Sequence, residues 1–181
     1  MKEFKRLVDL EVNRLFLKVF PPLGEDKKLD IDISIGLVFS KEPNQMCIIS
    51  TDEEDRWMPS IHFSSIPKRN IYSWSSFNNR MKDWMDLKEY EKLDIEYYEV
   101  TNTVLFNNLV SQKIINVEFL SVKNIELPFG VKLIFDKDYI LSTPTADGNT
   151  IETSSFNKNK NITNFEELGE LEFSDIEHRA T

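Results

Sequence analysis

The alternation of apolar and polar residues is clearest between residues 29 and 40, which run "LDIDISIGLVFS". Every second side chain there is apolar, a spacing that places one face of a strand on a core and the other toward solvent. A turn, "KEPN", and a second apolar run, "MCIIST", follow. Residues 29–51 are therefore predicted to form an antiparallel hairpin, and "SIHFSSI" (60–66) a third strand.

Two other segments show apolar residues at helical spacing. The first covers residues 2–20 and ends before Pro21, because proline disfavours helical backbone in the residue that precedes it. The second covers residues 73–87, where large side chains recur at steps of three and four. A third, shorter helix is predicted over residues 102–112. The apolar stripes of the first two helices comprise Phe4, Leu7, Val8, Leu15, Phe16 and Val19, and Trp74, Phe77, Met81, Trp84 and Met85.

Strand patterns return in the C-terminal half of the chain. Runs rich in β-branched and aromatic residues cover 114–122, 131–135 and 139–143, with turn sequences between them. Both faces of the last two runs are partly apolar, which predicts a hairpin in the interior of a sheet, covered on both sides. The whole pattern predicts an α+β fold, in which two or three helices pack on one face of an antiparallel sheet of about six strands.

A single α+β domain is predicted over residues 1–156, since a chain of 181 residues can bury one core without disulfides or metals. Residues 157–181 differ in composition, because they are rich in Asn and Glu and carry apolar residues only at intervals. This acidic C-terminal segment is expected either to dock as a short helix or strand, or to be partly disordered.

The chain is acidic, with 31 Asp and Glu against 22 Lys and Arg and a formal net charge of -9. Nucleic-acid binding draws on Lys and Arg, so DNA and RNA are not expected as partners, whereas a cationic protein is. No apolar run approaches the roughly 20 residues that span a bilayer, and the N-terminus lacks a signal-peptide pattern. A cytoplasmic location without membrane contact is expected. Cys47, the only cysteine, lies in an apolar run and is interpreted as a buried, unreactive thiol.

No cofactor, metal or catalytic residue is assigned from motifs. The five glycines form neither common phosphate-binding pattern, and two histidines with one cysteine give no zinc spacing. Asp136 and Asp138 are interpreted as one turn and Asp147 as part of another, not as a calcium loop. An alternative function is a small hydrolase that uses His62 with nearby Asp or Ser residues, although no nucleophile-elbow motif is present.

Two acidic clusters are the candidate partner-binding sites. Acidic side chains around an aromatic ring suit a cationic protein, because charge speeds the encounter and a desolvated ring supplies much of the affinity. The clusters comprise Asp52, Glu53, Glu54, Asp55 and Trp57, and Glu166, Glu167 and Glu170. The alternative for the first cluster is an ordinary solvated loop.

Residues 113–155, "KIINVEFLSVKNIELPFGVKLIFDKDYILSTPTADGNTIETSS", resemble the C-terminal part of small bacterial immunity and immunity-like proteins, which are partners of secreted toxins. In those proteins a strand after a helix leads into a hairpin and then into a loop with Asp or Gly. The resemblance implies a non-enzymatic protein that neutralises a partner by binding, and it carries no functional residues over. An intracellular protein-binding module, an immunity-type inhibitor by this resemblance, is therefore predicted. A hydrolase or a structural subunit of an assembly are the alternatives.

Overall fold

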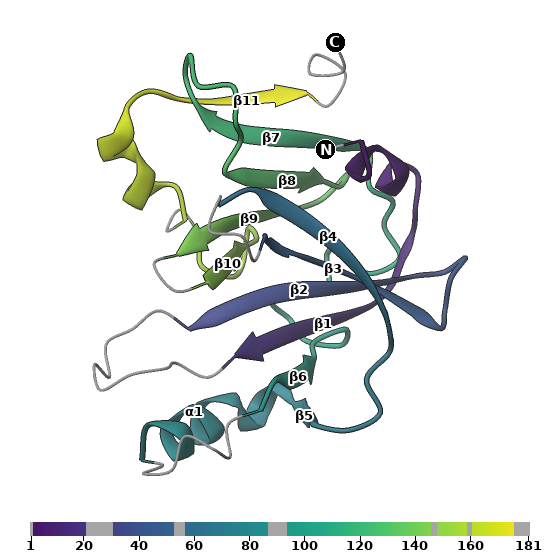
Figure 1. Ribbon diagram of the computed structural model, residues 1–181. Coiled ribbons are helices and arrows are strands. Elements are labelled where there is room, and N and C mark those ends of the chain that lie inside the picture. Colours follow the sequence, from purple (N-terminus) through teal and green to yellow (C-terminus); the bar gives the residue numbers. More distant parts are fainter. Residues whose placement is uncertain are drawn as a thin grey trace.

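The computed structural model describes residues 2–20, 31–52, 57–86, 94–145, 148–158 and 161–175, and these residues form two β-sheets (Figure 1). The first sheet has six strands in the order β4-β3-β2-β1-β6-β5. All neighbours in it are antiparallel except β5 and β6, which are parallel. Its strands are β1 (Val12–Phe20), β2 (Asp32–Phe39), β3 (Gln45–Thr51), β4 (Pro59–Ser65), β5 (Ile71–Ser73) and β6 (Glu96–Glu99).

The second sheet has five antiparallel strands in the order β10-β9-β8-β7-β11. Its strands are β7 (Asn116–Val122), β8 (Gly130–Ile134), β9 (Tyr139–Thr145), β10 (Gly148–Glu152) and β11 (Leu171–Asp175). One α-helix, α1 (Phe77–Asp86), occurs in the described part of the chain, and it lies in the crossover that a parallel pair such as β5 and β6 requires. The 3₁₀ segments there are η1 (Phe4–Leu7), η2 (Trp74–Ser76) and η4 (Thr163–Leu168).

The main core is one cluster of buried apolar side chains drawn from both sheets, so the sheets pack together through it. Leu15 and Ile35 of the first sheet and Val117 and Leu133 of the second are fully buried there. Each sheet also carries a smaller buried cluster on its other face. These clusters comprise Phe16, Val38, Met46 and Ile48, and Leu120, Phe129, Leu141 and Phe165. Several strands are therefore apolar on both faces.

The predicted fold class, an α+β domain with one antiparallel sheet of about six strands and two or three helices on one face, is wrong. The chain is mostly β, with two sheets and a single α-helix among the described residues. The helix predicted over residues 2–20 is the largest error, since only Phe4–Leu7 forms a 3₁₀ turn and β1 takes most of the remainder. Asp9 ends that turn with a φ of 67°. Because β1 is buried on both faces, its sequence does not show a strand's alternation.

The helix predicted over residues 102–112 is also wrong. These residues form successive turns, in which the N–H of Phe106 donates to the carbonyl of Thr103 at 3.2 Å. Val104, which the helical stripe would bury, is 83% exposed, and Ser111 has a φ of 59° that a helix does not allow. The helix predicted over residues 73–87 is confirmed by α1, which follows η2.

The predicted hairpins are confirmed. β2 and β3 pair around the "KEPN" turn, and β4 adds to β3 as the third strand. β8 and β9 pair in the interior of the second sheet, and the N–H of Phe135 donates to the carbonyl of Asp138 at 2.9 Å, which closes the turn that contains Asp136. The second predicted turn, at Asp147, lies outside the described residues.

Asn149 on β10 joins the two sheets through buried hydrogen bonds. Its amide nitrogen donates to the carbonyl of Ile33 on β2 at 2.9 Å, and its amide oxygen accepts from the hydroxyl of Ser142 on β9 at 2.9 Å. Its backbone N–H donates to the carboxylate of Asp32 at 3.0 Å. The adjacent Gly148 has no room for a side chain, since a Cβ would lie 2.5 Å from Cγ of Asp32. β10 is therefore fastened to the first sheet.

Replacing Asp32 by asparagine is expected to stabilise the protein at neutral pH. Burial raises the pKa of the Asp32 carboxyl, an effect that the hydrogen bond from Asn149 and the charge of Lys18 only partly offset. A carboxyl whose pKa is raised on folding stabilises the fold below its unfolded pKa, and this contribution is lost as the pH rises through the folded pKa. Asparagine keeps the acceptor oxygen and removes the buried charge.

Urea unfolding at several pH values measures this effect. The free energy of unfolding of Asp32→Asn should exceed that of the natural chain most near neutral pH. The difference should shrink toward about pH 3, where the natural carboxyl is also neutral. Asp83→Asn, at an exposed position on α1, is the matched control. An advantage that grew on acidification would contradict the prediction.

Candidate protein-binding surface

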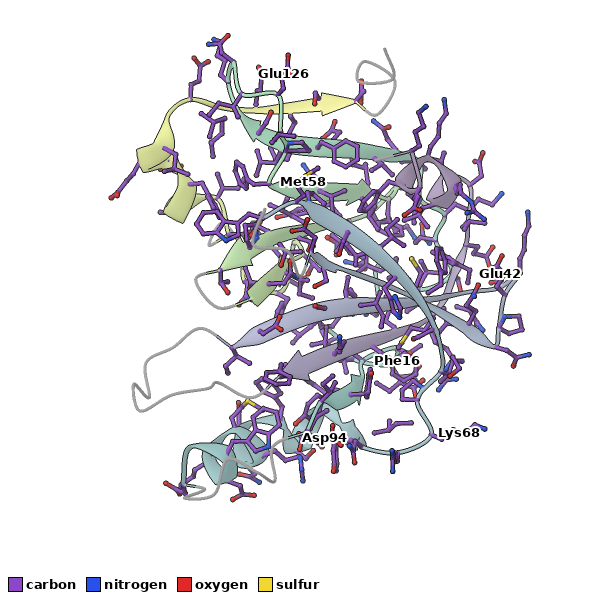
Figure 2. The ribbon with its side chains drawn as sticks, viewed as in Figure 1. Phe16, Glu42, Met58, Lys68, Asp94 and Glu126 are labelled. Carbon is purple, nitrogen blue, oxygen red and sulfur yellow. The ribbon has the colours of Figure 1, made fainter. Side chains whose placement is uncertain are left out.

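The first predicted acidic cluster lies where β3 turns into β4. The N–H of Asp52 donates to the carbonyl of Met58 at 2.8 Å, and Figure 2 shows Met58 at the end of β4. Trp57 exposes 49% of its surface beside this bond. The structure thus brings Asp52 and Trp57 together at the end of one hairpin. The remaining members of the cluster lie outside the described residues: Glu53, Glu54 and Asp55.

Trp57 has an unusual backbone conformation. Its φ of 56° lies in the left-handed region, which bulky side chains rarely adopt. Such a conformation persists only where the surrounding structure requires it, and it is often found at functional positions. Trp57 is therefore the described member of this cluster that is best suited to contact a partner.

The second predicted acidic cluster begins on η4, which packs on the outer face of the second sheet. Phe165 stacks on Phe129 with 4.3 Å between ring centroids and is buried with Leu120 and Leu141. This contact anchors η4 to the sheet. The next three residues face solvent: Glu166, Glu167 and Leu168.

Gly169 turns the chain from η4 into the edge of the second sheet. Its φ of 139° is unfavourable for residues with a side chain, and a Cβ there would lie 3.1 Å from the side chain of Val122. Glu170 follows, and its carboxylate pairs with Lys123 at 2.8 Å. Its carbonyl also accepts the backbone N–H of Lys123 at 2.7 Å, so β11 begins in register with β7.

The exposed residues of η4 and β11 form a surface on which acidic and large apolar side chains alternate. We call this surface the acidic edge, and it comprises Glu166, Glu167, Leu168, Glu170, Glu172 and Phe173. The β7–β8 connection adds the exposed side chains of Ile125 and Leu127. Figure 2 shows Glu126 of this connection at the same end of the molecule as β11. Exposed apolar side chains gathered within a polar rim are typical of a protein interaction site.

The predicted site contained the acids Glu166, Glu167 and Glu170 but neither Leu168 nor Phe173. Exposure of these apolar side chains depends on which faces η4 and β11 turn toward the sheet, and that is decided by contacts with distant strands. The available signal was the run "LGELEF" (168–173), in which acidic and apolar residues alternate.

Phe173 is held on the sheet by a cation–π contact. The ammonium of Lys132 on β8 lies 5.0 Å from the ring centroid of Phe173 and 4.9 Å from that of Tyr139. The hydroxyl of Tyr139 donates to Glu152 at 2.6 Å, and burial together with this bond raises the pKa of Tyr139. The ring of Phe173 is therefore oriented, although it is still 40% exposed.

The described residues do not assemble a catalytic site around His62. The imidazole is exposed on β4, whereas the hydroxyls of the flanking Ser60 and Ser64 donate to the carbonyls of Ser50 and Ser65, both at 3.3 Å. Within the same described ranges, no three His, Cys, Asp or Glu side chains are grouped as metal ligands. Both serine hydroxyls are thus bonded to backbone carbonyls, and the nearby acids Glu53, Glu54 and Asp55 lie outside the described residues.

Two other groups considered from the sequence have structural roles. Cys47 is buried, as predicted, and burial raises the pKa of its thiol to about 12. Asp138 is also buried, and one carboxylate oxygen accepts the N–H groups of Tyr139 and Ser154, both at 2.8 Å. Asp138 thus ties the β8–β9 turn to the segment after β10.

A pocket of about 250 Å³ lies between η1 and the β2–β3 hairpin. Its lining residues are Arg6, Leu7, Leu10, Glu42, Gln45 and Phe63. The polar members of the lining are all exposed, and no described hydrogen bond fixes their side chains in the pocket. The acidic edge is therefore the stronger candidate site.

No protein-family model, curated protein or solved structure matches this chain. None of the helices in the described part of the chain has the length and apolar character that a membrane crossing needs. The exposed surface of the described residues is therefore what indicates a function.

Proposed function

We propose that this chain is a protein-binding module that holds a basic protein at the acidic edge. The supporting observation is that one anchored segment exposes the acids Glu166, Glu167 and Glu172, and Glu170 paired to Lys123, together with Leu168 and Phe173. Large apolar side chains supply affinity when a partner covers them. The surrounding acids select the sign of the partner's charge and speed the encounter.

The charge of the whole chain supports the same partner class. A net charge of -9 attracts basic proteins over distances longer than a contact. Exposed charges are screened beyond about 8 Å at physiological salt, so the complex is expected to weaken as salt is added. The apolar contribution of Leu168 and Phe173 should survive that screening.

We further propose that binding neutralises the partner, which is a toxin. The support for this step is the resemblance of residues 113–155 to immunity proteins in their strand and hairpin, although the helix that precedes the strand in those proteins is replaced here by turns. In the structure these residues contribute β7 to β10, the scaffold on which η4 and β11 pack. A toxin gene beside the gene for this chain would supply the first purified partner to test.

Affinity capture with the natural chain and an acidic-edge variant tests the proposal. The variant carries Glu166→Gln, Glu167→Gln and Glu172→Gln, which leaves the Glu170–Lys123 ion pair intact, and it should bind the captured basic protein about tenfold more weakly, because each exposed charge pair contributes about 0.5 kcal/mol. Titration calorimetry at about 0.15 M salt measures the difference. A matched control removes three exposed acids elsewhere, at Glu3, Asp83 and Asp86.

The control should bind like the natural chain. Equal weakening of both variants would mean that net charge matters and the acidic edge does not. If no basic protein is captured by either chain, the proposed function is wrong. A further variant with Asp52→Asn and Trp57→Ser measures the contribution of the first cluster separately.

A further inference from the structure

We propose that the acidic edge takes its partner by strand pairing, with an extended segment of the basic protein adding to β11 as a further strand of the second sheet. This inference rests on the proposed function and specifies its mode. β11 ends the order β10-β9-β8-β7-β11 and pairs on one side only, with β7. Figure 1 shows β11 at the margin of the molecule, and none of the described strands lies beyond it.

The hydrogen-bond pattern of β11 leaves alternate backbone groups facing outward. The carbonyl of Glu170 accepts the N–H of Lys123 at 2.7 Å, so these opposed residues form a hydrogen-bonded pair. Such pairs alternate with non-bonded pairs in antiparallel strands, so the backbone N–H and C=O groups of Glu172 and Ser174 face β7. The outward-facing N–H and C=O groups therefore belong to Leu171, Phe173 and Asp175.

The other side of β7 agrees with this assignment. The carbonyl of Leu120 accepts the N–H of Phe129 at 2.9 Å, so the backbone of Leu120 faces the β8 side. Leu120 is opposite Phe173 in the register of β7 and β11. The backbone N–H and C=O groups of Leu120 face away from β11. The backbone of Phe173 therefore has no hydrogen-bond partner on β7, and its N–H and C=O groups face the open side of β11.

The remaining sheet edges are less suited to a basic strand. β10 is occupied, because Asn149 bonds to Asp32 and Ile33 of the first sheet. β5 has three residues, and β4 begins with a proline and carries no acid. β11 has neither proline nor lysine, and its pairing with β7 shows no bulge, so it lacks three common devices that block strand addition.

The side chains of β11 define the chemistry of the added strand. Leu171 packs with the outer cluster of the second sheet, and Phe173 contacts Lys132 on the same face. Glu172 points to the opposite face and is exposed. An added strand would therefore place apolar residues beside Phe173 and Lys or Arg beside Glu172, because cross-strand neighbours interact directly. The occupant is a segment in which basic and apolar residues alternate.

Residue-resolved amide hydrogen exchange tests this mode with a capped heptapeptide that alternates lysine and valine. In the free protein the amides of Leu171, Phe173 and Asp175 should exchange fast and those of Glu172 and Ser174 slowly. A saturating amount of peptide should slow the first group about tenfold or more and leave the second unchanged. The same peptide with alternate N-methylated backbone nitrogens should not have this effect.

Variants separate strand pairing from charge attraction. Glu172→Lys should abolish protection of the outward amides, because lysine on an edge repels a basic strand. Asp83→Lys makes a similar charge change on α1, which Figure 1 shows at the opposite end of the molecule from β11, and should retain protection.

Four outcomes would overturn the inference. If the N-methylated peptide binds equally well, or the outward amides stay fast while peptide is bound, strand pairing is wrong but binding at the acidic edge stands. If the outward amides are already slow in the free protein and speed up on dilution, a second copy of this chain occupies the edge. If neither the peptide nor a basic protein binds, strand pairing and the proposed function both fail.

Discussion

Replacing Arg80 by methionine is expected to lower the free energy of unfolding by about 3 kcal/mol, because a buried carboxylate then loses its counter-ion. Nε of Arg80 on α1 donates to Glu96 of β6 at 2.8 Å, and Glu96 is only 4% exposed. The hydroxyl of Tyr98 donates to the same carboxylate. The guanidinium lies 3.7 Å from the ring centroid of Tyr72, and its bond to Glu96 raises the pKa of Arg80.

A double-variant cycle in urea separates the charge from the packing. Adding Glu96→Gln to Arg80→Met should restore at least half of the lost free energy of unfolding, because burying a neutral amide costs less free energy than burying an unpaired carboxylate. Lys82→Met, at an exposed position on the same helix, should change stability by less than about 0.5 kcal/mol. A double variant less stable than Arg80→Met would contradict this assignment of the cost to the unpaired charge.

The contact between α1 and β6 also shows why this helix was predictable. Its apolar residues lie on one face only, with Met81 and Trp84 buried and Asn78 and Lys82 exposed, so the period of the pattern is visible. The β2–β3 and β8–β9 hairpins were predictable because short turn sequences separate their apolar runs. In each case the contacts that fix the element are close in sequence.

β1 was not predictable in this way. It lies between β2 and β6 and carries buried residues on both faces, with Leu15 and Leu17 in the main core and Phe16 in the outer cluster. A strand buried on both faces need not alternate, and in β1 the apolar residues match helical spacing by coincidence. Its partner β6 follows about eighty residues later, a contact that no local pattern records.

The acidic edge was predicted only in part, because some of its features depend on contacts that are distant in sequence. Its carboxylates are visible in composition, whereas the exposure of Leu168 and Phe173 follows from the packing of Phe165 and from the pairing of β11 with β7. The second sheet thus uses its two edge strands differently. β10 is fastened to the first sheet through Asn149, and β11 carries the proposed binding surface.

Because the hydrogen bonds of Asn149 hold β10 against the first sheet, Asn149→Leu is the second substitution with a large expected effect. It should lower the free energy of unfolding by about 3 kcal/mol. Asn149 is fully buried, and leucine of similar size can neither donate to the carbonyl of Ile33 nor accept from the hydroxyl of Ser142. Each polar group left buried without a partner costs about 1–3 kcal/mol. The backbone N–H that bonds to Asp32 is unchanged, so β10 should still form.

Urea unfolding of three further variants tests the origin of this loss. Ser142→Ala alone should cost about 1 kcal/mol, because it removes one of the two bonds. Ser142→Ala combined with Asn149→Leu should be more stable than Asn149→Leu, since the unpaired hydroxyl is then absent. Asn107→Leu, at an exposed position, should have little effect. If Asn149→Leu were as stable as the natural chain, the side-chain hydrogen bonds of Asn149 would contribute nothing to holding β10 against the first sheet.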